Sequence, residues 1–462
     1  EKSGFRLEDT RGLLPGCTIG QCHVAYIGSE SGDLGSATMP ATTMPATTVH
    51  SGGSVLLAAN NDTTVTYITG AVAFTLSGQG SAGGAVTVND LTGHTRAYIS
   101  DDAQVTALAG DQTDTIAAAV GGYDITFPED GGDNGTSVAP PGSVPSAVTG
   151  DGEVNADDPA WTHTREATGN YTDIRGVAVT SNVTETIKGF SVAASVAKSV
   201  SADIGVFVPV STRESRAWIG GTVNLGENDV TETGQDVVVT ASTDYHAFGL
   251  AVPAAASQTG AVAPGVSWTT VKLTTEAYID QGAQVAAGGD VLVVAAASQH
   301  VTQLTIGGAI TDGDGGGAWD ASVTGLFFTS ETSAEIRGED TDSYAQVMAG
   351  GNVLVSATDE TVETGVAGGL TVVLSEIGAA AGAGFVYTHI DKTTTAEIGH
   401  YAEVDAGGNS GNQIVGLNGD IDSANKSFGH EQLVGISVQA QSSEKLTNFG
   451  IAMAGASWLG VG

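Results

Sequence analysis

Small and β-branched residues alternate with polar residues over long stretches of this chain. The best-formed stretch is TTEAYIDQGAQVAAGGDVLVVA at residues 274–295, where apolar residues fall at strand-like spacing. A period of two predicts β-strands, and the Gly-Gly pair within the stretch predicts a corner or turn. We therefore expect a core lined by Ala277, Ile279, Val285, Val291 and Val293.

The same pattern recurs along the chain and indicates a repeat architecture. Relatives of VAAGGDVLVVA begin at Val49 and Val347, and a T-x-A-x-I motif recurs about every 60 residues, with one interval twice as long. Such self-similarity predicts an all-β solenoid in which equivalent residues stack in ladders. Coil size stays open, since a repeat could form two coils of about 30 residues or three of about 20. The alanines of the motif are Ala97, Ala217, Ala277, Ala334 and Ala396.

Three segments depart from the repeat. Residues 1–47 lack the pattern and are expected to form an extension or cap, with the solenoid over residues 48–462. Acidic insertions at about 110–173 and about 409–429 are expected to project as loops from one face. The chain begins at Glu1 and its last repeat stops before a T-x-A-x-I motif, so we expect either a segment of a longer protein or a coil that another subunit completes.

Charge narrows the range of partners. The chain has 52 acidic and 15 basic residues, a formal net charge of −37. A chain this acidic repels nucleic acid and anionic membranes. No apolar run approaches the roughly 20 residues of a membrane-spanning helix, so we expect no membrane span. The 66 glycines and the many small residues suit a thin β core.

Calcium is the cofactor that the sequence best motivates, although none is required. TDGDGGGAWD places acidic residues among glycines, and GDGEVNADD is similar to part of an EF-hand-like loop. Carboxylate oxygens separated by flexible glycines suit Ca²⁺, while a polar turn is the plainer interpretation. The candidate ligands are Asp312, Asp314 and Asp320 in the first segment and Asp151, Asn155 and Asp158 in the second.

Other candidate chemistry is sparse. Cys17 and Cys22 are separated by four residues and could close a small disulfide loop. Paired carboxylates such as Asp101 and Asp102 could serve a glycan-active β-helix enzyme, but adjacent acidic pairs are expected by chance in this composition. We therefore expect no enzyme activity and keep a glycan-active enzyme as the alternative. The aromatic residues beside the alanine ladder, Tyr98, Trp218 and Tyr278, predict either an outward stripe for glycans or stacking between coils.

The T-x-A-x-I motif, the V-x-A-G-G-x-V-x-V-x-A motif and the Gly/Ala-rich strand together resemble repeats of large bacterial secreted surface proteins. The resemblance is to the filamentous-adhesin, haemagglutinin-like families, including leukotoxin-type filamentous adhesins, over roughly residues 48–462. It implies a right-handed parallel β-helix at the cell surface or outside the cell, with an adhesive or structural role. We expect a fibre component that associates with itself end to end and contacts cell-surface glycans or other surface proteins. A calcium-stabilised binding module is a further alternative.

Overall fold

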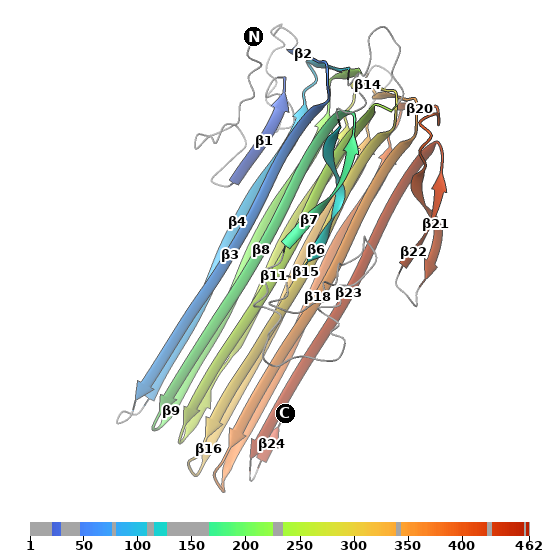
Figure 1. The fold of residues 1–462 in the computed structure, drawn as a ribbon. Coiled ribbons are helices and arrows are strands. Elements are labelled where there is room, and N and C mark those ends of the chain that lie inside the picture. The colour runs from blue at the N-terminus through green and yellow to red at the C-terminus, as the bar shows by residue number, and fades with distance from the viewer. Residues whose placement is uncertain are drawn as a thin grey trace, which may run out of the picture.

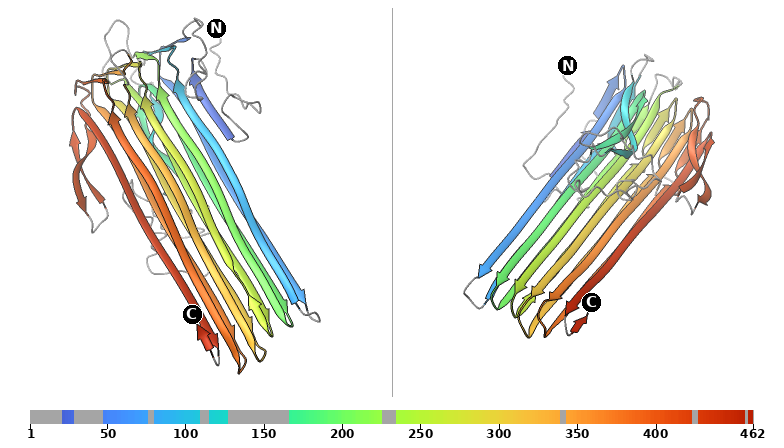
Figure 2. Two further views of the ribbon diagram at one scale, coloured as in Figure 1. Left: turned by 180° about the vertical axis from the view of Figure 1, so that it is seen from behind. Right: turned by 60° about the horizontal axis from the view of Figure 1, so that its bottom comes forward.

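The chain forms a parallel β-helix, and every helix or strand among its described residues is a β-strand (Figure 1). Each coil runs along a long strand of sheet C, turns, returns along a long strand of sheet A, and passes through a short strand of sheet B. Sheets A and C lie face to face, as the views of Figure 2 show. The computed structural model describes residues 21–28, 47–75, 80–108, 115–126, 166–224, 234–338, 343–422, 427–456 and 459–461.

The strands of each sheet follow one another from coil to coil. Sheet C contains β3 (Val55–Thr75), β8 (Gly176–Ala197), β11 (Asp236–Ser257), β15 (Val291–Thr311), β18 (Val353–Val373) and β23 (Ile436–Ala456). Sheet A contains β1 (Gln21–Ile27), β4 (Gly80–Ile99), β9 (Val200–Ile219), β12 (Gly260–Val262), β13 (Gly265–Ile279), β16 (Gly316–Ile336), β19 (Gly378–Ile398) and β24 (Leu459–Val461). Sheet B contains β2 (Thr47–Ser51), β5 (Ala103–Ala107), β10 (Thr222–Asn224), β14 (Gln284–Ala287), β17 (Gln346–Ala349) and β20 (Glu403–Ala406).

One repeat of about 60 residues forms one coil, so neither coil size considered from the sequence holds. Ala277 pairs in register with Ala217 on one side and with Ala334 on the other. The long strands run for about twenty residues before the chain turns, for example 21 residues in both β15 and β16. Each long strand has a corner half, next to sheet B, and a tip half, next to the turn that joins sheets C and A.

The core of the corner half is the apolar ladder that the sequence predicts. Ala277, Ile279, Val285, Val291 and Val293 are all buried in one cluster that extends from coil to coil. Each backbone group pairs with the coils above and below, which satisfies the strands while alanine, valine and isoleucine fill a thin interior. The predicted inward ladder is confirmed.

Parallel pairing begins before residue 48. Strand β1 pairs with β4 so that Ala25 and Ile27 continue the ladder of Ala97 and Ile99. Strand β2 pairs with β5 in sheet B. The signal was present in HVAYI at residues 23–27, a shortened copy of HTRAYI that lacks the threonine of the repeated motif.

Two antiparallel hairpins leave the coil at its corners. Strands β6 (Ile116–Thr126) and β7 (Glu166–Ile174) form one hairpin, and β21 (Ile414–Asp422) and β22 (Ser427–Leu433) form the other. The first hairpin packs Ala118 and Ile174 against Ala178 and Val238 on the outer side of sheet C. Across the described ranges, no helix is long and apolar enough to cross a membrane.

Candidate functional sites

The acidic turn between β15 and β16 does not bring the three predicted calcium ligands together. Asp312 and Asp314 are exposed in the turn, whereas Asp320 lies within β16 and points inward with 6% of its surface exposed. Among the described residues, no group of three or more acidic, histidine or cysteine side chains could hold a metal ion. The second set of candidates, Asp151, Asn155 and Asp158, lies outside the described residues and stays a prediction.

Asp320 instead occupies a narrow polar interior. Its carboxylate lies opposite Gly307 and Gly369, where any side chain at either glycine would clash with it. Ser322 donates to Oδ2 at 3.4 Å, and Oδ1 has no hydrogen-bond partner. Burial raises the pKa of Asp320 to about 7, against the smaller opposite effect of its hydrogen bonds to Ser322 and Ala321.

The predicted disulfide involves one described residue. Cys22 lies on β1 and is disulfide-bonded, and no described cysteine is free. Cys17 lies outside the described residues, so its part in the bond stays a prediction. Of the carboxylates considered for an enzyme, Asp101 and Asp102 lie in the turn after β4, where Ser100 donates to Asp102.

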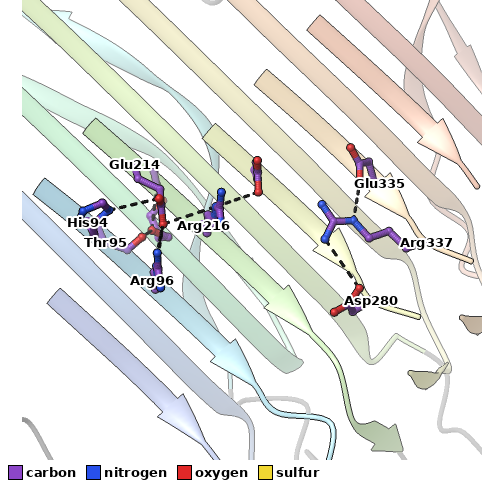
Figure 3. Close-up of polar contacts among 11 residues, drawn as sticks. His94, Thr95, Arg96, Glu214, Arg216, Asp280, Glu335 and Arg337 are labelled. Carbon is purple, nitrogen blue, oxygen red and sulfur yellow. Dashed lines mark hydrogen bonds and ion pairs between the residues drawn. The ribbon is translucent and has the colours of Figure 1, made fainter. Parts of the chain in front are cut away.

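A network of charged side chains crosses the outer side of sheet A in its corner half (Figure 3). Glu214 accepts from Arg96 Nε at 2.7 Å, and its second oxygen lies 3.2 Å from His94 Nδ1. Arg216 Nε lies 3.5 Å from Glu214 and 2.9 Å from Glu276. These residues come from β4, β9 and β13, so the network ties three consecutive coils together.

Electrostatics favour the ionised form of the central carboxylate. Burial by itself would raise the pKa of Glu214, but the hydrogen bond from His94 and the charges of Arg216 and Arg96 outweigh it and lower the pKa to about 2. With its charge opposed by neighbouring arginines on a flat strand surface, Glu214 is placed for cross-coil pairing rather than for proton transfer.

Beside this network, aromatic rings stack from coil to coil. Tyr26, Tyr98, Trp218 and Tyr278 form a ladder with centroid distances of 5.3, 4.2 and 5.6 Å and nearly parallel rings. The Arg337 guanidinium closes the ladder, 3.5 Å from the Tyr278 ring centre, and donates to Glu335 at 2.6 Å. Tyr98, Trp218 and Tyr278 are almost fully buried, so the stacking interpretation is confirmed.

A second group of polar residues fastens the corners of sheet C. Asp236 accepts from the Asp290 backbone N–H at 2.7 Å, and Asp290 accepts from that of Asn352 at 2.7 Å. Ser410 and Asn412, at the start of the second insertion, also donate to Asp290 at 2.9 and 3.2 Å. Asp290 and Asn352, each of which follows a Gly-Gly pair, are therefore ladder residues of the corner, and both also contact the start of the second insertion.

The sequence did not predict the charged pairs that are buried between the sheets of the β-helix. Arg213 donates to both oxygens of Glu185, at 2.9 and 2.5 Å, and both side chains are fully buried. Lys392 lies 2.8 Å from the buried Asp359, to which Ser330 also donates. The signal was positional, since Glu185 has the same strand parity as the core residue Val179. Alternation therefore identified the inward face but not the charges that it holds.

A further cluster of aromatic side chains is partly exposed on the outer side of sheet A. The Trp268 and Tyr387 rings lie 6.0 Å apart and nearly parallel above Gly325, and Phe327 contacts both. Phe327 and Tyr387 are 37% and 38% exposed. Flat, exposed rings of this kind can stack on apolar faces of ligands.

Comparisons of the chain with protein-family models, with curated proteins and with solved structures found no match.

Proposed function

We propose that this protein is an extracellular structural and adhesive β-solenoid that builds rods by stacking end to end. The observation behind the proposal is that, among the described strands, the two ends of the β-helix leave complementary parts of sheet A unpaired. The proposal also rests on the resemblance to filamentous adhesins and on the strongly acidic composition, which keeps surfaces soluble and apart except where specific contacts form.

At one end, sheet A is paired only in its tip half. Strand β24 pairs with Ala379–Ala381, and within the described residues the rest of the outer edge of β19 has no partner strand. At the other end, β1 pairs with Gly93–Ile99, and the tip half of β4 has no described partner on that side. Strands β24 and β1 would therefore fill different halves of one shared layer between two copies.

The core ladders also stop abruptly at β23. Val353 and Val355 are fully buried, whereas Ile436 and Val438, the next residues of the same ladders, are each 44% exposed. Stacking β23 on β3 of another copy would cover these side chains and pair two rows of backbone groups, which is the ordinary fate of an exposed strand edge. Partners at the outer surface would be cell-surface glycans or other surface proteins, with Trp268, Phe327 and Tyr387 as contact residues.

Negative-stain electron microscopy tests the proposal with the full chain. We expect rods whose length grows with protein concentration, and Ile436→Lys with Val438→Lys should shorten them to single units because inward lysines block the end. The matched control is Gln441→Lys with Ser443→Lys, at half-buried outer positions of β23, which should leave the rods long. Single particles of the unaltered protein at every concentration would contradict the proposal.

A further inference from the structure

The outer side of sheet C is apolar throughout its tip half. One row of outward positions crosses all six long strands and contains Ile68, Phe190, Leu250, Leu304, Val366 and Phe449. The three rows nearer the tip start at Gly70, Val72 and Phe74 and contain only glycine, alanine, valine, leucine, isoleucine, methionine and phenylalanine. We call these four rows the apolar face.

This surface inverts the usual polarity of the fold. In the tip half, the interior holds Ser191, Ser195, Asp203 and Asp320, all buried, while large apolar side chains point outward. Ile306, Leu370 and Met453 are 44%, 45% and 60% exposed. In the corner half the order is reversed, with valines and isoleucines inside. An alternating sequence with its apolar set on the outer side needs a partner that covers it.

The size of the apolar face fits a protein partner. With strands about 4.8 Å apart and outward residues about 6.7 Å apart along a strand, four rows across six strands cover about 770 Å². Typical monomers expose patches of about 300–600 Å², and a standard stable interface buries about 800 Å² on each partner. The apolar face also carries no charged residue, so the apolar faces of two copies can approach each other closely although each chain has a net charge of −37.

We propose that the apolar face binds the apolar face of a second copy, with the long strands of the two copies antiparallel. The two tip halves then overlap, and the corner halves extend in opposite directions. The base of the β6–β7 hairpin, where Ala118 and Ile174 pack on the outer side of sheet C, lies against the corner half and outside the apolar face. The antiparallel arrangement also separates the charged networks of the two corner halves, which limits repulsion between the acidic chains.

Sheet edges favour a second copy over a lipid layer. Among the described strands, β3 pairs only with β8 and β23 only with β18 along their full lengths. In a copy that is not stacked into a rod, the outer edges of β3 and β23 would therefore carry unpaired N–H and C=O groups into the hydrocarbon, which is costly. In a face-to-face dimer the same edges lie at the rim of the interface and remain in water.

Sedimentation velocity tests the dimer separately from the rods. The measurement uses the full chain with Ile436→Lys and Val438→Lys, so that end-to-end stacking is blocked while the apolar face is intact. The weakest interfaces of this size have a Kd in the micromolar range, so we expect dimers at a protein concentration of about 100 μM. Adding Ile306→Glu with Met453→Glu should weaken dimerisation at least about tenfold, because like charges would be buried against apolar side chains.

The matched control adds Ala296→Glu with Gln441→Glu, which places the same charges on outer positions of the corner half of the same two strands. The control should dimerise like its parent. Three results would each overturn the proposal. The first is that the parent, the chain with Ile436→Lys and Val438→Lys, is monomeric at about 100 μM, and the second is that both double-Glu variants dimerise equally. The third is that the parent floats with phosphatidylcholine vesicles and that Ile306→Glu with Met453→Glu abolishes this flotation. If the unaltered chain forms dimers but no rods, the result would instead contradict end-to-end stacking alone.

Discussion

Glu214 is the side chain on which the outer polar network depends. It receives contacts from His94, Arg96 and Arg216, and only 14% of its side chain is exposed. Because these partners hold its pKa at about 2, below the value of an unfolded glutamate, folding favours the ionised form. The resulting stability is present above about pH 4.5 and is lost as the pH falls toward 2.

Glu214→Gln should therefore destabilise the fold in a pH-dependent manner. At pH 7 we expect the free energy of unfolding to fall by roughly 1–3 kcal/mol, because charge-assisted hydrogen bonds are lost. The difference from the unaltered protein should shrink as the pH falls from about 4.5 to about 2, where Glu214 itself becomes protonated. Urea unfolding at several pH values measures the difference in the free energy of unfolding. The control is Glu331→Gln, at an exposed position. A constant difference between the two proteins across that range would contradict the assignment.

Single residues were predictable where alternation alone decides their position. Ala277 and Ile279 were placed in the core because strand parity repeats every two residues. Asp320 was grouped with Asp314 because the two residues are close in sequence and were expected to share one loop. In the structure β16 begins at Gly316, and Asp320 points inward from this strand. The start of a strand within a glycine run has no strong local signal, so the sequence did not separate the buried Asp320 from the exposed Asp312 and Asp314.

At the scale of the strands, sheets A and C fit together through glycines opposite large side chains. A side chain at Gly189 would lie 1.8 Å from the Phe207 ring, and one at Gly249 would lie 2.7 Å from it. Gly189 and Gly249 are partners on β8 and β11, and Phe207 projects from β9 between the sheets. These glycines are required by close approach between sheets rather than by turns.

Gly189→Ala should accordingly destabilise the helix. We expect the free energy of unfolding to fall by roughly 1–3 kcal/mol, since the added methyl group forces Phe207 or the sheets apart. Gly260→Ala on β12 is the matched control, because a side chain there meets nothing nearer than the Val200 side chain at 3.7 Å and the position lies outside the apolar face. It should be neutral or slightly stabilising, as alanine is entropically favoured over glycine in a strand. Denaturant midpoints measure both, and equal effects of the two substitutions would contradict the packing argument.

The length of the coil could not be predicted at this scale. Corners between sheets have Gly-Gly signals, as at residues 288–289 and 350–351. The turns at the tip share no such signal, since β8 and β9 are joined by Lys198 and Ser199 whereas β15 and β16 are joined through glycines. Without a consistent turn signal, a long strand and two shorter strands have the same period-two pattern.

Across the whole molecule, the dominant long-range force is repulsion among carboxylates. A net charge of −37 opposes compact structure, and the described arginines of the outer network neutralise only a small part of it. Salt shortens the Debye length from about 30 Å at 0.01 M to about 8 Å at 0.15 M. Repulsion between coils should therefore weaken steeply over this range of ionic strength.

Raising NaCl from about 0.01 M to about 0.15 M should raise the Tm by several degrees, and KCl should have the same effect because screening depends on ionic strength. Differential scanning calorimetry of the full chain with the end-blocking pair Ile436→Lys and Val438→Lys measures this without interference from rods. A Tm that does not respond to salt would contradict the dominance of repulsion. CaCl2 at matched ionic strength separates screening from binding: a further rise that a chelator removes would indicate bound calcium, for which Asp151, Asn155 and Asp158 are the remaining candidates.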